Sequence, residues 1–112
     1  DLSSRAIMEK AVEELRHSGL ECILCQDDYI CDEVVRKLAR MGVRIPDQMK
    51  VASCHYSRIL ENYPVTITSL KFNITELGRR SCQVLLDMIH GKTVPDKTLL
   101  DYEIILKEST KG

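Results

Sequence analysis

The chain has 112 residues, of which 44% are hydrophobic and 29% are charged, and its 16 basic and 17 acidic residues leave a formal net charge of -1. This length suits one small domain or a piece of a larger one, and the composition is that of an ordinary globular protein. A DNA-binding module usually carries a basic face, so these scattered charges argue against direct DNA contact by this segment. No apolar run approaches the roughly 18 residues of a membrane span.

The five cysteines are an odd number, and no secretory apolar segment is visible. We therefore expect reduced thiols in the cytoplasm instead of a disulfide scaffold. The sequence opens at Asp1 without an initiator Met and runs almost directly into a helix pattern. We expect a piece of a longer protein whose true N-terminus, with any targeting signal, lies outside this sequence.

The first predicted element is a helix that begins after Ser3 or Ser4 as N-cap and ends before Gly19. Its apolar residues recur with helical spacing and are Ile7, Met8, Ala11, Val12 and Leu15. A short apolar run over residues 20–25, LECILC, has the length of a strand and follows this helix.

A second helix follows the strand at once, with Asp28 predicted as its N-cap and acidic residues in its first turn, where the helix dipole favours them. Gly42 ends the helix, and Pro46 prevents it from resuming. Its predicted buried stripe is Ile30, Val34, Leu38 and Met41. Another short strand is expected over residues 50–54, KVASC.

A polar loop over residues 57–63 and a β-branched run over residues 65–70, VTITSL, come next. A third helix opens with Asn73 and Glu76 in capping-box spacing, and Gly91 closes it. The predicted stripe of this helix is Ile74, Leu77, Leu85, Met88 and Ile89. A last strand over residues 102–107 precedes a polar tail.

Alternating strands and helices predict an α/β fold, in which a parallel sheet is flanked by helices, because parallel strands cannot be joined by a tight turn. Ligands of such open sheets bind beyond the carboxyl ends of the strands. These ends carry Gln26-Asp27-Asp28 after the first strand and Cys54-His55-Tyr56 after the second. We expect both clusters to face one crevice.

Cys22 and Cys25 form a CxxC pair that resembles half of a metal site. On a strand, however, residues three apart point to opposite faces and cannot share one tetrahedral ion. We predict no metal site and no cofactor, and interpret these thiols as small buried hydrophobes. Cys31 and Cys82 lie on predicted helices and are interpreted as packing residues too. No catalytic residue is predicted, because strand alternation also turns Cys54 away from its neighbour His55.

The Asp27-Asp28 pair admits three interpretations. Helix capping is the simplest, and a cap at Asp28 is worth about 1 kcal/mol. A response-regulator receiver also ends its first strand in paired acids, but it needs a phospho-accepting Asp where this chain has Ser53-Cys54-His55. The third interpretation is ligand binding, and a secreted solute-binding protein of the same fold is a further alternative, disfavoured by the unpaired cysteines.

Three segments resemble the C-terminal part of the effector-binding domain of the lactose/galactose-repressor family of bacterial transcription regulators. They are ILCQDDYICDEVVRKLARMGVRIPDQMKVAS, ITSLKFNITELGRRSCQVLLDMIHGK and IILKEST, in this order. Asp27-Asp28 matches an Asn-Asp pair of the family, and residues 42–47 match a link to the next strand. Residues 67–69 match a Leu-Thr-Thr crossing between lobes, and residues 107–110 resemble a closing Arg-x-Ser-Thr.

The resemblance implies part of a two-lobed, periplasmic-binding-protein-like type I domain, in which a small molecule, often a sugar or purine, binds between the lobes. Residues 1–71 would belong to the C-terminal lobe, residues 72–95 would form a helix of the N-terminal lobe, and residues 96–112 would be a return strand and tail. The helix-turn-helix domain that reads DNA would lie upstream, outside this chain. The implied protein is a sensor and not an enzyme, acting by ligand-dependent lobe closure.

The resemblance places the ligand contacts at Asp27, His55, Leu2 and Ser3. Asp27 stands where the family has Asn, His55 where it has a ligand-gripping Asp, and Leu2 where a stacking aromatic is frequent. Recognition of hydroxyls by carboxylates uses charge-assisted hydrogen bonds, so this pocket favours a different ligand, phosphorylated or acidic if the imidazole is protonated. The alternatives are that His55 is a solvated loop residue and that Asp27 is a solvated residue before the cap.

Members of this family dimerise partly through the helix that corresponds to residues 29–41 and the loop that corresponds to residues 57–63. The resemblance therefore places Tyr29, Val34, Leu38 and Tyr56 at the interface of a homodimer. The expected partners are a small-molecule effector, a second copy of the chain, and DNA only through the upstream domain. No membrane partner is expected.

Overall fold

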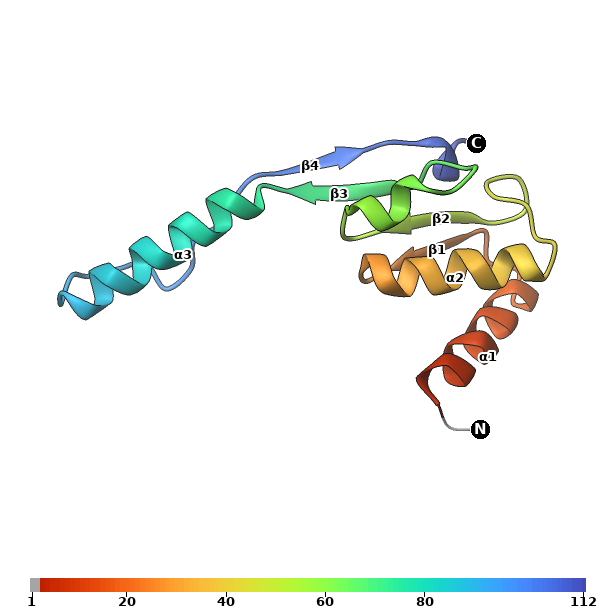
Figure 1. Ribbon diagram of the computed structural model, residues 1–112, viewed down its shortest axis with the longest axis horizontal. Coiled ribbons are helices and arrows are strands. Elements are labelled where there is room, and N and C mark those ends of the chain that lie inside the picture. The colour runs from red at the N-terminus through yellow and green to blue at the C-terminus, as the bar shows by residue number, and fades with distance from the viewer. Residues whose placement is uncertain (1–2) are drawn as a thin grey trace.

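The computed structural model describes residues 3–112, which form a four-stranded sheet with two helices packed beside it and a third helix projecting away from it (Figure 1). The helices are α1 (Ser4–His17), α2 (Asp28–Arg40) and α3 (Ile74–Ile89). The strands are β1 (Cys22–Cys25), β2 (Lys50–Ser53), β3 (Thr68–Phe72) and β4 (Tyr102–Ile105). Short 3-10 helices, η1 (Arg58–Glu61) and η2 (Glu108–Thr110), complete the chain.

The strands lie in the order β1-β2-β3-β4, with β1, β2 and β3 parallel and β4 antiparallel to β3. The predicted α/β class with a parallel sheet is therefore confirmed. The chain leaves the sheet at the end of β3, forms α3, and returns as β4, whose direction the sequence pattern did not predict. Within residues 3–112 no helix has the length and apolar character needed to cross a membrane.

The helix ends follow the predicted signals. Asn73 caps α3, and its Oδ1 accepts a hydrogen bond of 3.0 Å from the backbone N–H of Glu76. Gly42 and Gly91 both have a φ of 72°, a left-handed conformation that glycine adopts without a steric penalty. The predicted ends of the second and third helices are confirmed.

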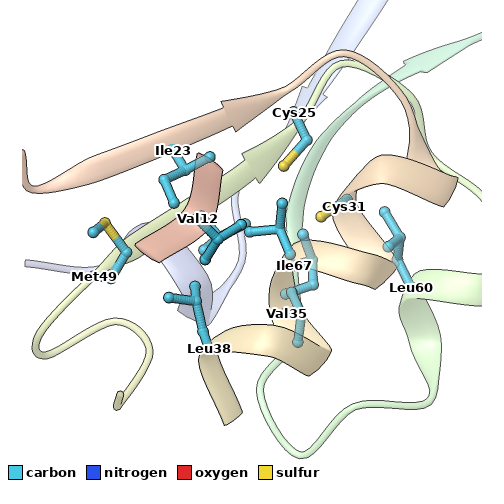
Figure 2. Close-up of a cluster of buried hydrophobic side chains, with 11 residues drawn as sticks. Val12, Ile23, Cys25, Cys31, Val35, Leu38, Met49, Leu60 and Ile67 are labelled. Carbon is cyan, nitrogen blue, oxygen red and sulfur yellow. The ribbon is translucent and has the colours of Figure 1, made fainter. Parts of the chain in front are cut away.

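The hydrophobic core lies between α2, the inner face of the sheet and one turn of α1 (Figure 2). Leu38 and Met49 are fully buried, and Val12 is the one buried residue that the described part of α1 contributes. The predicted stripe of α2 holds, because Val34 and Leu38 are buried while Ile30 and Met41 pack partly against them.

Side chains of β1 alternate between the two faces of the sheet. Ile23 and Cys25 point into the core, whereas Cys22 and Leu24 are exposed, with Leu24 at 68%. The predicted alternation of the CxxC pair is confirmed, but Cys22 is not the buried hydrophobe that we expected. Among the described residues, helices cover only the inner face of the sheet (Figure 1).

Helix α3 projects from the sheet and has no buried residue (Figure 1). Its predicted apolar stripe is exposed, and Ile74, Leu85 and Ile89 are each more than half exposed, at 63%, 58% and 67%. Cys82 is exposed as well, so its interpretation as a packing residue is wrong within residues 3–112. The helical pattern was correct, but its apolar side stays largely exposed, and within the described residues only the returning segment 95–100 runs beside it.

The C-terminal Ser-Thr segment fastens the tail to the middle of the sheet. The Ser109 hydroxyl is fully buried, donates to the Val51 carbonyl at 2.5 Å and accepts from the Thr68 N–H at 2.8 Å. The Thr68 hydroxyl lies 2.7 Å from the Thr110 hydroxyl and accepts from the Lys107 N–H at 2.8 Å. These bonds hold β2 and β3 in position, which in turn positions the loops at their carboxyl ends.

Candidate functional site

The carboxyl ends of β1 and β2 bring two polar loops together. Cys25 is the register partner of Ser53, and the Cys54 N–H donates to the Cys25 carbonyl at 2.8 Å. Beyond these ends, His55 Nδ1 lies 3.5 Å from Asp28 Oδ1. The predicted convergence of the two strand ends is therefore found, but the contact runs through Asp28 and not Asp27.

Asp27, and not Asp28, is the N-cap of α2. Its backbone is extended, with φ of -144° and ψ of 176°, and its Oδ1 accepts a hydrogen bond of 2.8 Å from the Ile30 N–H. The predicted cap at Asp28 is wrong because the helix begins one residue earlier than expected. The alternative in which Asp27 is a solvated residue before the cap is wrong for the same reason. A ligand contact by Asp27 stays a prediction.

Asp28 is a buried carboxylate, only 5% exposed, although it lies at the surface end of a strand. It accepts from the Tyr29 N–H at 3.1 Å and from the Ser57 hydroxyl, and its Oδ1 lies 3.5 Å from His55 Nδ1. The hydrogen bond from Ser57 is the largest effect on the pKa of Asp28, and together with His55 it holds that pKa below its ordinary value against the opposing effect of burial. Asp28 therefore carries a stabilised negative charge.

His55 is fixed by the fold, so it is not the solvated loop histidine of the alternative interpretation. Its ring faces Asp28, and its side chain is 39% exposed. Its backbone is held by Ser53, whose hydroxyl donates to the His55 carbonyl at 2.8 Å and accepts from the His55 N–H at 3.2 Å. His55 is one of the residues of a pocket wall.

The pocket beside His55 has a volume of about 590 Å³. Its wall comes from His55 and Tyr56 after β2, from residues 71–75 at the junction of β3 and α3, and from residues 101–103 at the start of β4. It therefore lies where the chain departs from the sheet into α3 and returns as β4.

Sequence reasoning missed the wall contributed by β3 and β4. Phe72 and Tyr102 are direct register partners across the antiparallel pair, and both aromatic residues line the pocket. Lys71 Nζ lies 5.6 Å from the centroid of the Tyr56 ring, within reach of a cation–π interaction. The pairing of β4 with β3, which the sequence does not reveal, was the missing signal.

Tyr56, predicted at the dimer interface, lies on the pocket wall. Its backbone N–H donates to the Leu70 carbonyl at 2.9 Å, which links the loop after β2 to β3. Its hydroxyl donates to Glu61, and this hydrogen bond raises the pKa of Tyr56. Its place in an interface stays a prediction.

Ser3, another predicted ligand residue, is not part of this pocket wall. The Ser3 hydroxyl caps α1, where it accepts from the Ala6 N–H at 3.2 Å. Leu2 lies outside the described residues. The N-termini of α1 and α2 together form a smaller pocket of about 260 Å³, lined in part by Ser4 and Tyr29. A ligand role for Ser3 stays a prediction.

The prediction that Val34 and Leu38 lie at the dimer interface is wrong. Val34 and Leu38 are 3% and 0% exposed, because their side chains fill the core of their own chain and leave no surface for a second copy. Tyr29, on the opposite side of α2, is 72% exposed and is available to a partner.

Two cysteines are buried in the hydrophobic core, as the sequence analysis predicts. Cys25 and Cys31 are both buried in the core, and the neighbouring Cys25 thiol together with burial raises the pKa of Cys31. Within residues 3–112 no group of three His, Cys, Asp or Glu side chains is arranged to hold a metal ion.

Residues 2–110 match the family model described as a periplasmic binding protein-like domain. The chain belongs to this family. It is 24% identical over 103 residues to the HTH-type transcriptional repressor MelR of Bacillus subtilis, a match that covers 92% of this chain and 29% of that protein. The chain thus spans less than a third of the length of this curated relative.

Solved structures with this fold include a LacI family transcriptional regulator from Bifidobacterium animalis, with a TM-score of 0.84 at 26% identity, covering 95% of this chain and 40% of that one. A LacI family regulator from Arthrobacter, in complex with lactose, has a TM-score of 0.77 at 23% identity, covering 99% and 42%. These matches confirm the resemblance to the lactose/galactose-repressor family and the periplasmic-binding-protein-like fold. The relatives are transcription regulators, which supports neither the receiver nor the solute-binding alternative.

Proposed function

We propose that this chain is part of the effector-sensing domain of a LacI-type transcription regulator, and that its effector binds in the pocket beside His55. The observation that carries the proposal is the position of this pocket at the carboxyl ends of parallel strands, where α/β proteins bind ligands. The membership of the chain in the periplasmic binding protein-like family supports the same site.

The proposed mechanism is a shift between two arrangements of the lobes. The pocket wall includes the end of β2 and the start of α3, so one ligand contacts both the sheet and the segment that leaves it. A ligand that binds one arrangement better shifts the population toward it. The exposed apolar side of α3 supports the assignment of residues 72–95 to an N-terminal lobe, with residues 1–71 in the C-terminal lobe and residues 96–112 as return strand and tail.

The effector in this proposal is a sugar or a related metabolite. The Arthrobacter structure with the same fold binds lactose, and the pocket here combines aromatic rings with polar side chains that suit hydroxyl groups. DNA is bound by a domain outside these residues, the whole protein works as a cytoplasmic homodimer, and it performs no catalysis. The exposed Tyr29 supports the homodimer, and the free thiols of the chain support the cytoplasmic location.

The test is ligand-dependent stabilisation of the intact protein that carries this chain. A panel of monosaccharides, disaccharides and their acid and phosphate derivatives is screened by thermal shift, and hits are measured by calorimetry. We expect His55→Ala to weaken binding by about tenfold or more, the value of a charge-assisted hydrogen bond. His17→Ala, at the exposed end of α1, is the matched control and keeps full affinity. A panel without any hit, or a His55→Ala variant that binds normally, contradicts the proposal.

A further inference from the structure

We infer that the effector is a hydroxylated acid, such as a sugar acid or a sugar phosphate, whose acidic group binds between His55 and Lys71. This inference rests on the proposed function and specifies its ligand. It also assigns Asp28, which is buried behind His55 and is not among the residues of the pocket wall, as the residue that positions the imidazole.

The first step concerns the orientation of His55. An ionised carboxylate can only accept hydrogen bonds, so the ring directs its Nδ1 donor at Asp28 across the distance of 3.5 Å. The opposite nitrogen, Nε2, is then left for a ligand in the pocket, because His55 is one of the residues of its wall. An acidic group that arrives there completes a carboxylate–imidazolium–anion arrangement, in which both ring nitrogens donate.

Asp28 is held firmly enough to serve as this anchor. Its side chain is 7% exposed, and it is also hydrogen-bonded to Ser57 and to the Tyr29 N–H. The loop after β2 and the start of α2 are thereby connected through one carboxylate. The position of His55 thus depends on a residue that the effector does not touch.

The second step concerns Lys71, a cationic side chain of the same pocket wall. Lys71 lies at the end of β3, and its Nζ is 5.6 Å from the ring centroid of Tyr56, the residue next to His55. The lysine ammonium has three donors and no acceptor, which matches a carboxylate or phosphate group. His55, in the loop after β2, and Lys71, near the end of β3, therefore bring donors to the same wall.

The third step accounts for the acidic residues of the same pocket. Asp101 and Glu103, at the start of β4, are part of its wall and would repel a simple inorganic anion. Their carboxylates instead accept hydrogen bonds from hydroxyl groups. A ligand with an acidic group at one end and hydroxyls along its length satisfies both sets of side chains, and Phe72 and Tyr102 offer ring surface to its carbon skeleton.

The experiment compares neutral and acidic members of matched pairs on the intact protein that carries this chain. The probes are glucose with gluconate and glucose 6-phosphate, galactose with galacturonate, and ribose with ribose 5-phosphate. We expect at least one acid to bind about tenfold or more tighter than its neutral partner, as measured by calorimetry at constant ionic strength.

Substitutions test whether His55 and Lys71 cause this preference for the acid. His55→Asn and Lys71→Met should each remove most of the preference for the acid, whereas Lys97→Met, a charge removal outside the pocket wall, should leave it unchanged. Asp28→Asn should reduce the preference, and Asp28→Glu should restore part of it, which a merely structural role does not require. The melting temperature of each ligand-free variant shows whether it is folded, and a variant that does not fold is replaced by His55→Gln or Lys71→Gln.

The outcomes separate this inference from the proposed function. If neutral sugars bind as tightly as their acids, the inference is overturned and the proposed function stands. If no member of any pair binds, the inference is overturned, and the wider panel described above decides the proposed function separately. If an acid binds preferentially but His55→Asn and Lys71→Met keep the preference, the assignment of the acidic group to these two residues is overturned.

Discussion

Asp27 and Asp28 are adjacent acids with different tasks at the end of β1. Asp27 caps α2 through the Ile30 N–H, and Asp28 is buried against Ser57 and His55. The difference follows from a shift of one residue in the start of the helix, because the extended residue becomes the cap and the next one turns inward. A helix start is uncertain by one or two residues from sequence, so the pair could be predicted but the division of its tasks could not.

The first prediction at this scale concerns pH. The pKa of Asp28 is lower in the folded protein than its ordinary value of about 3.9, so its contribution to stability is present above that value and is lost as the pH falls through the lower folded pKa. Asp28→Asn should therefore flatten the fall of the unfolding midpoint between pH 5 and pH 2, two values that bracket this titration. Urea unfolding at several pH values measures this, and equal slopes for both proteins would contradict it.

The second residue-scale prediction concerns the cap of α2. Asp27→Ala should lower the free energy of unfolding by about 1 kcal/mol, whereas Asp27→Ser should retain most of it because a serine hydroxyl also caps. Chemical denaturation of the two variants side by side gives the difference. If alanine is tolerated as well as serine, the hydrogen bond to the Ile30 N–H contributes nothing to stability.

At the scale of elements, the features that could be predicted from the sequence were those that depend on neighbouring residues. Helical spacing, the cap at Asn73 and the glycines at 42 and 91 depend on neighbouring residues, and all of them were found. The pocket wall from Lys71, Phe72 and Tyr102 depends on which strands pair and in which direction. Such pairing joins residues that are distant in sequence, so one sequence does not reveal it.

Ser109 is a second example. The sequence shows that Ser109 matches a family motif, but it does not show that the buried hydroxyl joins the tail to the sheet. Ser109→Ala leaves the Val51 carbonyl and the Thr68 N–H without their buried partner. We expect a loss of about 1–3 kcal/mol in the free energy of unfolding. The matched control is Ser4→Ala at the exposed start of α1, which should change little. A Ser109→Ala variant as stable as this control would show that the tail does not fasten the sheet.

At the scale of the whole molecule, the described chain is uneven in its burial. One side of the sheet has a closed core, whereas α3 exposes its apolar residues and projects away (Figure 1). Exposed apolar patches of this kind mark surfaces that another part of a protein covers. The proposed two-lobe arrangement gives such a cover to α3.

This arrangement predicts that α3 is buried in the intact protein. Leu85→Asp should lower its melting temperature by several degrees, since it places a charge in a covered apolar surface. Gln83→Asp, on the same helix, is the control for the added charge and should have little effect. Equal melting temperatures for Leu85→Asp and the parent protein would mean that α3 remains exposed.

The central claim is that the effector binds where the ends of β2 and β3 meet the departure of α3. Hydrogen–deuterium exchange of the intact protein, with and without an effector found by the screen, tests it most directly. The claim predicts that the effector slows exchange in residues 26–30, 54–57 and 71–75 together, because these segments surround or support the pocket. Protection confined to other segments, with these three unchanged, would contradict it.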